Sequence, residues 1–125
     1  MKKTWFLILL FSLLLSACAP AGEAAYENIT AEEAKALMDS EEGYIILDVR
    51  EQEEYDAGHI PNAILIPYTQ IEEKAATMLP DKEQLILVYC RSGRRSKIAA
   101  EALEDLGYTN IKEFGGIINW PYEVE

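Results

Sequence analysis

Two short apolar runs, Tyr44–Leu47 and Leu85–Tyr89, most constrain the fold of this chain. Each run is apolar at nearly every position and is short for a helix, which is typical of a strand buried on both faces of a parallel sheet. Segments with a helix-like pattern separate these two runs from each other and from further segments with weaker strand patterns. Strands that alternate with helices predict an α/β fold, with a central, mainly parallel sheet flanked by helices.

The weaker patterns complete five strands. In the helix that follows Cys90 and ends at Gly107, we expect Ile98, Ala102, Leu103 and Leu106 to form the apolar face. Strand patterns occur at 26–29, 63–66 and 111–114, and further helix patterns occur at 31–38, 51–56 and 70–78.

The start of the chain has the pattern of an export signal. Lys2 and Lys3 precede an apolar run at 5–15, which is shorter than the about 20 residues of a membrane span. Leu15-Ser16-Ala17-Cys18 then resembles the lipobox of bacterial lipoproteins, which implies cleavage before Cys18 and lipid on its sulfur. The alternative is an ordinary signal peptide with a chance cysteine. We expect an extracytoplasmic, membrane-anchored protein with a signal peptide at 1–17, a tether at 18–25 and one domain at 26–125.

The distribution of charge and of cysteines makes 90–97 the candidate functional segment. The net charge is −11, and so acidic a chain is not expected to bind nucleic acid without a basic face. The basic residues concentrate at 91–97, directly after Cys90. If Cys18 carries lipid, Cys90 has no partner for a disulfide, and it is then a candidate reactive thiol. The alternative is a buried cysteine that acts only as a small hydrophobic residue.

A thiol reacts as its thiolate, and an ordinary cysteine has a pKa of about 8.5. Cys90 lies where a strand ends and a helix begins, so the backbone amides of 91–96 can point at one centre and stabilise an anion. Gly93 permits the tight turn. The alternative is that Arg94, Arg95 and Lys97 form a solvated first helical turn, although cations there oppose the helix dipole. Asp48–Arg50 ends a neighbouring strand and is the second candidate place for a site.

Several segments together resemble the rhodanese family of sulfurtransferases. Cys90-Arg-Ser-Gly-Arg-Arg-Ser96 is similar to the family's active loop, and Leu47-Asp-Val-Arg50 with 58–63 is similar to its first signature. Gly115-Gly116 and Trp120 resemble its end. The resemblance covers essentially 26–125 and implies a rhodanese-like fold. It also implies a ping-pong reaction without a cofactor, in which a cysteine persulfide carries sulfur from a thiosulfate-like donor to cyanide or a thiol.

The resemblance implies a role for each matching residue. Cys90 matches the sulfur carrier, and Arg95 matches a position where many single-domain members carry arginine. Asp48 and Arg50 match a pair that we expect to organise the loop, with Glu54 as a further partner for Arg50. The loop residues that would surround the sulfur and bind an anionic substrate are Arg91, Ser92, Gly93, Arg94, Arg95 and Ser96.

We expect no chemical role for two residues outside the loop, His59 and Asn62. His59 is expected to be structural, and with one histidine and one free cysteine the chain lacks the usual ligands of a zinc site. Asn62 stands where the family often has glycine, and asparagine tolerates positive φ.

Three alternatives remain open. A phosphatase or arsenate reductase of the same fold would have a wider Cys-X5-Arg loop, whereas Cys90 and Arg95 form Cys-X4-Arg. A binding or regulatory module would need no reactive cysteine. A persulfide relay would pass sulfur from Cys90 to a protein partner.

Overall fold

The computed structural model describes residues 26–125. The predicted signal peptide at 1–17, Cys18 and the tether up to residue 25 lie outside the described residues. The strands of the described part form one five-stranded sheet in the order β1-β5-β4-β2-β3, and every neighbouring pair is parallel. This confirms the predicted α/β fold. The strands are β1 (Glu27–Asn28), β2 (Ile45–Asp48), β3 (Ile64–Leu65), β4 (Ile86–Cys90) and β5 (Ile111–Gly116).

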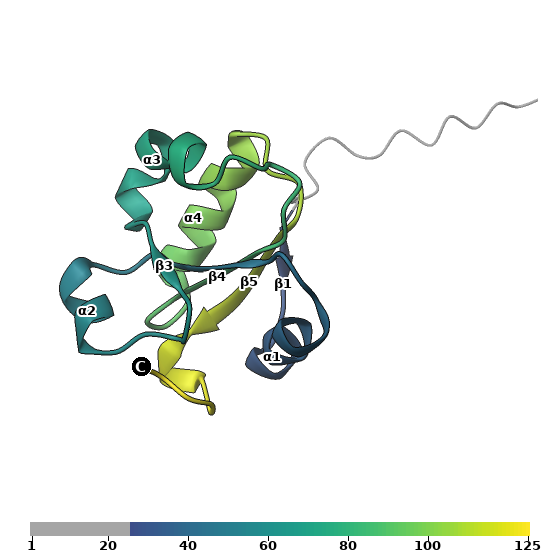
Figure 1. Cartoon of the computed structure of the whole chain (residues 1–125). Helices are drawn as coiled ribbons and strands as arrows, with labels where there is room; N and C mark the ends of the chain where they lie inside the picture. The colour runs from purple at the N-terminus through teal and green to yellow at the C-terminus, as the bar shows by residue number, and fades with distance from the viewer. Residues whose placement is uncertain (1–25) are drawn as a thin grey trace, which may run out of the picture.

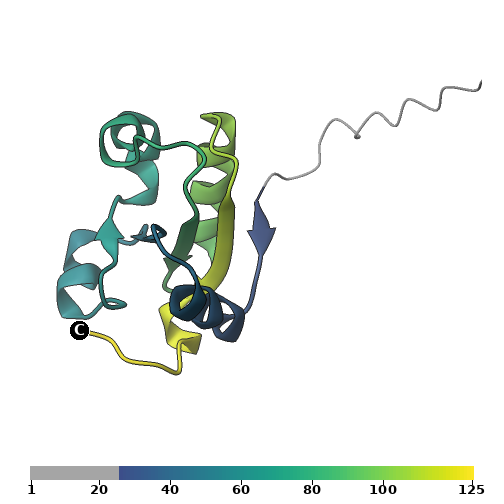
Figure 2. The same cartoon turned by 45° about the vertical axis from the view of Figure 1, so that its right-hand side comes forward.

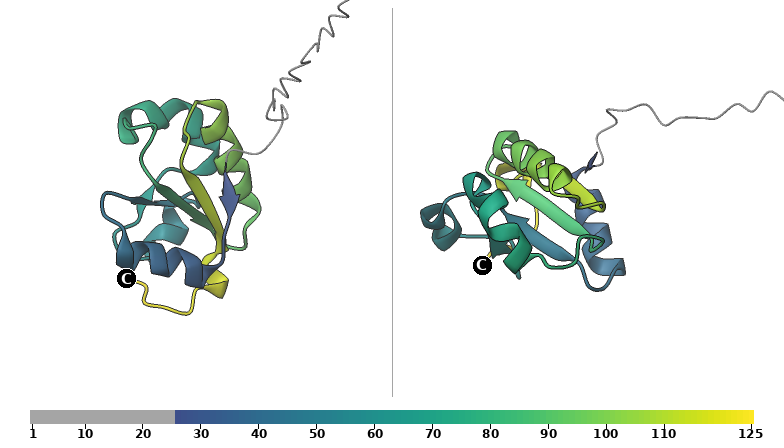
Figure 3. Two further views of the ribbon diagram at one scale, coloured as in Figure 1. Left: turned by 90° about the vertical axis from the view of Figure 1, so that its right-hand side faces the viewer. Right: turned by 90° about the horizontal axis from the view of Figure 1, so that it is seen from above.

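Helices cover both faces of this sheet (Figures 1 and 3). Thr30 caps the first helix, because its side-chain oxygen accepts a hydrogen bond from the Glu33 amide at 3.1 Å. Within residues 26–125, no helix is long and apolar enough to cross a membrane. The helices are α1 (Ala31–Ser40), α2 (Gln52–Ala57), α3 (Ile71–Met78) and α4 (Arg94–Asp105), with 3-10 turns η1 (Tyr68–Gln70) and η2 (Ile117–Asn119).

Strand β4 shows why the predicted strands are continuously apolar. It pairs with β2 on one side and β5 on the other. Its Val88 and Cys90 side chains enter the core under α3 and α4, whereas Leu87 and Tyr89 enter the core on the α1 face. Both sides of the strand are therefore buried, and no position requires a polar residue.

The predicted apolar face of α4 is wrong at one position. Ile98 is 40% exposed, whereas Ser96, Ala99, Ala100 and Leu103 are buried. The buried residues follow the helical period, and two of them are alanines that allow the helix to approach the sheet closely. The sequence pattern favoured the larger side chain because hydrophobicity alone does not reveal which face meets the sheet.

The C-terminal residue is hydrogen-bonded to His59, near the middle of the sequence. The His59 amide donates to the Glu125 carbonyl at 2.9 Å, and the Glu125 amide donates to the His59 carbonyl at 2.8 Å. Figures 1 and 2 show the C-terminus beside α2, below the carboxyl ends of the strands. The end of the chain thus borders the place where the sheet topology puts a ligand site.

Candidate active site

Cys90 is the last residue of β4, and only Arg91, Ser92 and Gly93 separate it from α4. The Gly93 amide donates to Cys90 Sγ at 3.0 Å, and Sγ lies 3.3 Å from Ser96 Oγ. Gly93 has a φ of 113°, a left-handed conformation that favours glycine. The tight turn directs the amides of Ser92, Gly93 and Ser96 at the sulfur, which are three of the six amides at 91–96 that the sequence predicted to point there.

This environment stabilises the thiolate. Burial by itself raises the pKa of Cys90, but hydrogen bonds from the Ser96 hydroxyl and from the Ser96, Gly93 and Ser92 amides outweigh it. The pKa of Cys90 is therefore lowered from its ordinary value. Because the thiolate is the nucleophilic form, the buried sulfur is prepared for reaction.

The loop rests directly on the end of β5. A Cβ added to Gly116 would lie 1.9 Å from the Arg91 carbonyl oxygen. The same oxygen accepts a hydrogen bond from the Ile118 amide at 3.2 Å. Gly116 is thus required by the close approach of two backbone segments, which explains its place in the Gly115-Gly116 pair.

Arg95 is held by an acid from a distant helix. Its two terminal nitrogens donate to the two oxygens of Glu54 in α2, at 2.6 and 2.9 Å. This bidentate pair lowers the pKa of Glu54 to about 2. Sequence reasoning paired Glu54 with Arg50, but its carboxylate accepts its hydrogen bonds from Arg95 and from the Glu51 amide. No local sequence signal could reveal this pair, since its members are 41 positions apart.

Asp48 and Arg50 form a buried network beside the cysteine. The Arg50 guanidinium donates to both Asp48 oxygens and to the Gly58 carbonyl, the latter at 2.7 Å. The Tyr89 hydroxyl also donates to Asp48, at 2.6 Å. Asp48 and Arg50 pair as predicted, and their bonds reach the residue that precedes Cys90.

Glu113 is a site residue that the sequence reasoning missed. It lies on β5 and is fully buried. Its Oε1 accepts a hydrogen bond from the Ser96 hydroxyl at 2.6 Å, so it lies directly behind the Cys90 loop. The signal available in the sequence was a single carboxylate in the predicted last strand, next to Lys112.

His59 has structural contacts, in agreement with its predicted role. Its Nδ1 lies 2.9 Å from the Tyr55 carbonyl oxygen, and its ring stacks on the Tyr55 ring at 3.8 Å. Asn62 has a φ of 68°, which confirms that asparagine takes the conformation expected at this position. Among residues 26–125, no group of three or more His, Cys, Asp or Glu side chains is placed to hold a metal ion.

A cleft of about 520 Å³ reaches the loop at Arg91. Cys90 itself is 1% exposed and does not line it. A second of the three loop arginines, Arg94, lies over the Tyr68 ring, 5.9 Å from its centroid. The cleft is lined by Arg50, Glu54, Ala57, Gly58, Arg91, Ile117, Ile118, Trp120, Tyr122 and Val124.

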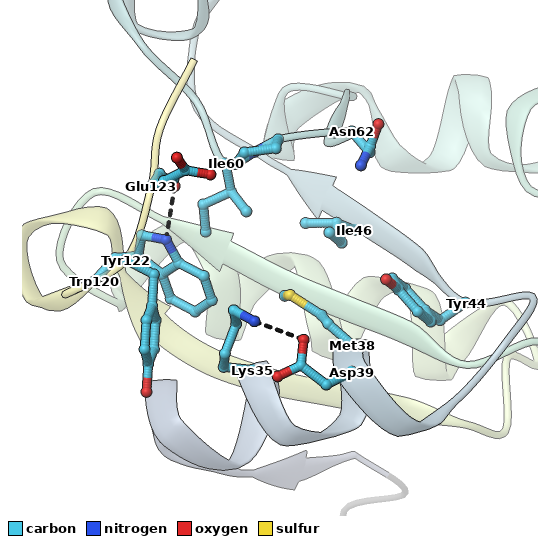
Figure 4. Close-up of a pocket in the computed structure, with 11 residues that line it drawn as sticks. Lys35, Met38, Asp39, Tyr44, Ile46, Ile60, Asn62, Trp120, Tyr122 and Glu123 are labelled. Atoms are coloured by element: carbon cyan, nitrogen blue, oxygen red, sulfur yellow. Dashed lines mark hydrogen bonds and ion pairs between the residues drawn. The ribbon is translucent and has the colours of Figure 1, made fainter.

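A second pocket, of about 200 Å³, contains no loop residue. Figure 4 shows it between α1 and the C-terminal segment, with Lys35 bonded to Asp39. Trp120 and Tyr122 line both cavities. The C-terminal segment therefore separates this pocket from the cleft that reaches the Cys90 loop at Arg91.

Comparisons with known proteins identify the family of this chain. The model of the rhodanese-like domain matches residues 30–121. The chain is 42% identical over 71 residues to thiosulfate sulfurtransferase PspE of Escherichia coli (strain K12), covering 57% of this chain and 68% of that protein. It is 31% identical to adenylyltransferase and sulfurtransferase UBA4 of Candida albicans, covering 78% of this chain but 24% of that longer protein.

A solved structure gives the same result for the fold. A rhodanese with anions from E. coli superposes with a TM-score of 0.62 at 36% identity, covering 66% of this chain and 96% of that one. The family match, the sheet topology and the cysteine loop all fall on the same residues. The chain therefore belongs to the rhodanese family, and its residues 30–121 are a rhodanese-like domain.

Proposed function

We propose that this protein moves a sulfane sulfur from a small anionic donor, such as thiosulfate, through a Cys90 persulfide to a thiol or cyanide. One observation carries the proposal: Cys90 Sγ is buried and surrounded by hydrogen-bond donors, with the Gly93 amide at 3.0 Å. Such a ring stabilises a thiolate and also the persulfide anion that replaces it.

The reaction needs no cofactor under this proposal. The Cys90 thiolate attacks the outer sulfur of thiosulfate, a new S–S bond forms, and the old S–S bond breaks to release sulfite. Cyanide or a thiolate then attacks the outer sulfur of the persulfide, and the Cys90 thiolate is restored. Each step passes one electron pair to the leaving group, so no oxidant is required.

The contacts of Arg95 favour sulfur transfer over an oxyanion enzyme. A phosphatase-type or arsenate-reductase-type loop uses a free arginine to bind a tetrahedral anion. Here both terminal nitrogens of Arg95 are engaged by Glu54. The loop is also one residue shorter than the Cys-X5-Arg pattern, which suits a single sulfur atom.

The cleft beside the loop supports an acceptor thiol carried by a protein. Ile118 is 61% exposed and Val124 is 54% exposed, and both line the cleft together with Arg91. Large exposed apolar side chains next to a reactive centre are typical of contact surfaces. A persulfide-relay role in which Cys90 passes sulfur to a protein therefore remains part of the proposal, and a purely binding module remains the alternative.

Membrane attachment is a separate part of the proposal and rests on the sequence alone. We propose that lipid on Cys18 holds the domain on the extracytoplasmic side of a membrane. More than one acyl chain on this residue would be needed for stable anchoring. Cys18→Ser should release the protein from the membrane fraction, and a protein that stays there would contradict lipid anchoring.

Intact mass tests the chemistry directly. Incubation with thiosulfate should add one sulfur to the protein, and cyanide should remove it as thiocyanate. Cys90→Ser should take up no sulfur, whereas Cys18→Ser, which alters the chain's other cysteine, should take it up normally. Equal uptake by Cys90→Ser and the unaltered chain would refute the mechanism.

A further inference from the structure

Glu54 presents a carboxylate to the cleft that reaches the Cys90 loop. Glu54 lines this cleft, whereas Arg95 does not, and both terminal nitrogens of Arg95 donate to the carboxylate, at 2.6 and 2.9 Å. These hydrogen bonds raise the pKa of Arg95, and the charge of Cys90 adds to the effect. The guanidinium is thus near enough to attract an anion at the loop, but a ligand in the cleft meets the carboxylate of Glu54.

The other cations of the cleft leave little free positive charge. Arg50 also lines the cleft, but its guanidinium donates to both oxygens of Asp48, in a pair that is almost fully buried. Within residues 26–125, the exposed Arg91 guanidinium takes part in no hydrogen bond or ion pair. Arg91 is therefore the one lining cation of the described chain that no carboxylate neutralises.

This distribution of charge disfavours a doubly charged ligand. A carboxylate repels an anion in proportion to the charge of that anion. The Cys90 thiolate adds a second negative charge beside the loop, and the net charge of the chain is −11. With one uncompensated cation, the cleft can neutralise a monoanion but not a dianion. A repulsive group of this kind gives specificity, because it rejects the wrong ligand.

The walls of the cleft suit an organic group. The cleft has a volume of about 520 Å³, within the range of about 300–1,000 Å³ that is typical of small-molecule sites. Ile117, Ile118 and Val124 contribute apolar surface to it. Apolar surface beside a single cation is complementary to a monoanion that carries an apolar group. Organic thiosulfonates, R–SO₂–S⁻, have this chemistry, whereas thiosulfate is a dianion without an apolar group.

We propose that Glu54 is a specificity-determining residue, which withholds Arg95 from ligands so that the cleft selects a monoanionic organic thiosulfonate over dianions such as sulfate and thiosulfate. The Cys90 thiolate attacks the outer sulfur of R–SO₂–S⁻ and a new S–S bond forms. The old S–S bond breaks, and the sulfinate R–SO₂⁻ leaves with the electron pair. The choice of donor rests on the proposed function, whereas the exclusion of dianions by Glu54 does not.

The first test needs no sulfur donor. Iodoacetamide alkylates Cys90 in the full chain, and trypsin releases this residue in the peptide 83–91, so mass spectrometry follows it separately from Cys18. Sulfate bound at the loop should slow the alkylation. A unit charge ~4 Å away changes the affinity for a monoanion about fivefold even in water, and that for a dianion by about the square of this. At constant ionic strength, the sulfate concentration that halves the rate should therefore fall roughly tenfold or more in Glu54→Gln.

Two further variants of α2 separate charge from packing. Glu53→Gln removes an equal charge from the adjacent exposed position, and should change the half-protecting sulfate concentration by less than about twofold. Glu54→Asp keeps the carboxylate and should stay within about threefold of the unaltered chain. If sulfate protects Glu54→Gln no better than Glu53→Gln, the inference is wrong. It is also wrong if Glu54→Asp behaves like Glu54→Gln, which would assign the effect to packing.

The second test uses the unaltered chain and does not depend on the folding of any variant. Intact mass measures the rate constant of persulfide formation from methanethiosulfonate and from thiosulfate, each divided by the rate constant of a free thiol with the same donor. This ratio should be about fivefold or more greater for methanethiosulfonate. Propanethiosulfonate should be used faster still, by up to about fourfold for each CH₂ group that is buried.

A normalised preference for thiosulfate in the unaltered chain would overturn the inference, even if Glu54→Gln failed to fold. Equal use of the methyl and propyl donors would overturn the apolar part of the assignment. Sulfur transfer from none of these donors would refute the proposed function and with it the choice of donor. The sulfate protection of Cys90 would then still decide the role of Glu54.

Discussion

Gly116→Ala tests whether the end of β5 holds the Cys90 loop in place. Gly116 has a φ of −129°, which alanine adopts without strain. The added Cβ would lie 1.9 Å from the Arg91 carbonyl oxygen and 2.5 Å from Ser92 Cα. These are backbone atoms that cannot rotate away, so the loop must move by roughly 1.5 Å to restore an ordinary contact of about 3.5 Å.

The expected cost follows from three contributions. Overpacking costs about 1–3 kcal/mol, and loss of the hydrogen bond from the Ile118 amide to Arg91 costs about 1 kcal/mol. The lower entropy of alanine in the unfolded chain offsets about 0.5 kcal/mol. We therefore expect a net loss of about 2.5 kcal/mol and a Tm lower by roughly 10–20 °C.

Urea unfolding and Cys90 alkylation measure the two consequences. Displacement of the loop should weaken the 3.0 Å contact from the Gly93 amide to Sγ. Hydrogen bonds to charged groups contribute about 1.5–3 kcal/mol, so the midpoint of Cys90 alkylation should rise by about one pH unit or more.

Gly43→Ala is the control for this experiment. Gly43 has a φ of 70° and nothing within 4 Å of an added Cβ, so alanine there should cost about 1 kcal/mol through backbone strain alone. The alkylation midpoint of Cys90 should not change. If Gly116→Ala leaves both stability and the alkylation midpoint unchanged, or behaves like Gly43→Ala, then the loop is not held by β5.

Three further predictions follow from the ion pairs of the site. Asp48→Asn should lower the free energy of unfolding by about 3 kcal/mol, because it leaves the buried Arg50 charge unpaired. Tyr89→Phe removes a hydroxyl that donates to Asp48 and accepts from the Ile60 amide, and should lose about 2 kcal/mol; a loss as large as that of Asp48→Asn in urea unfolding would contradict this. The depressed pKa of Glu54 means that its pair with Arg95 stabilises the fold above pH 4.5, and this stability is lost as the pH falls toward about 2. Over the same pH range, the free energy of unfolding of Glu54→Gln should decrease by roughly 0.5–1 kcal/mol less than that of the unaltered chain. Arg95→Gln should weaken thiosulfate use more at low salt than at high salt if the role of Arg95 is electrostatic, whereas a loss independent of salt would indicate a role in shape.

Much of the site was predictable because its central part is local in sequence. Cys90, the short turn and the start of α4 are contiguous, and backbone geometry alone brings the Gly93 amide to the sulfur. Asp48 and Arg50 are also neighbours, so their pairing needed no knowledge of the fold.

The partners of these groups could not be predicted in the same way. Glu54 binds Arg95 from 41 positions away, and this requires the relative placement of α2 and α4. Glu113 reaches Ser96 only because β5 lies beside β4. The buried face of α4 depends on how the helix is rotated against the sheet. This rotation buries Ser96 and the two alanines and leaves Ile98 exposed.

The sequence by itself determined the α/β class and the strand and helix order, and it singled out Cys90 as the candidate nucleophile. The reason is that burial on both faces demands continuous apolar runs, and a loop between a strand and a helix is a local structure. Only the tertiary structure decided that Glu54 holds Arg95, that Gly116 supports the loop and that Glu113 stands behind Ser96. Those contacts depend on strand register and helix orientation, which arise from the packing of the whole core.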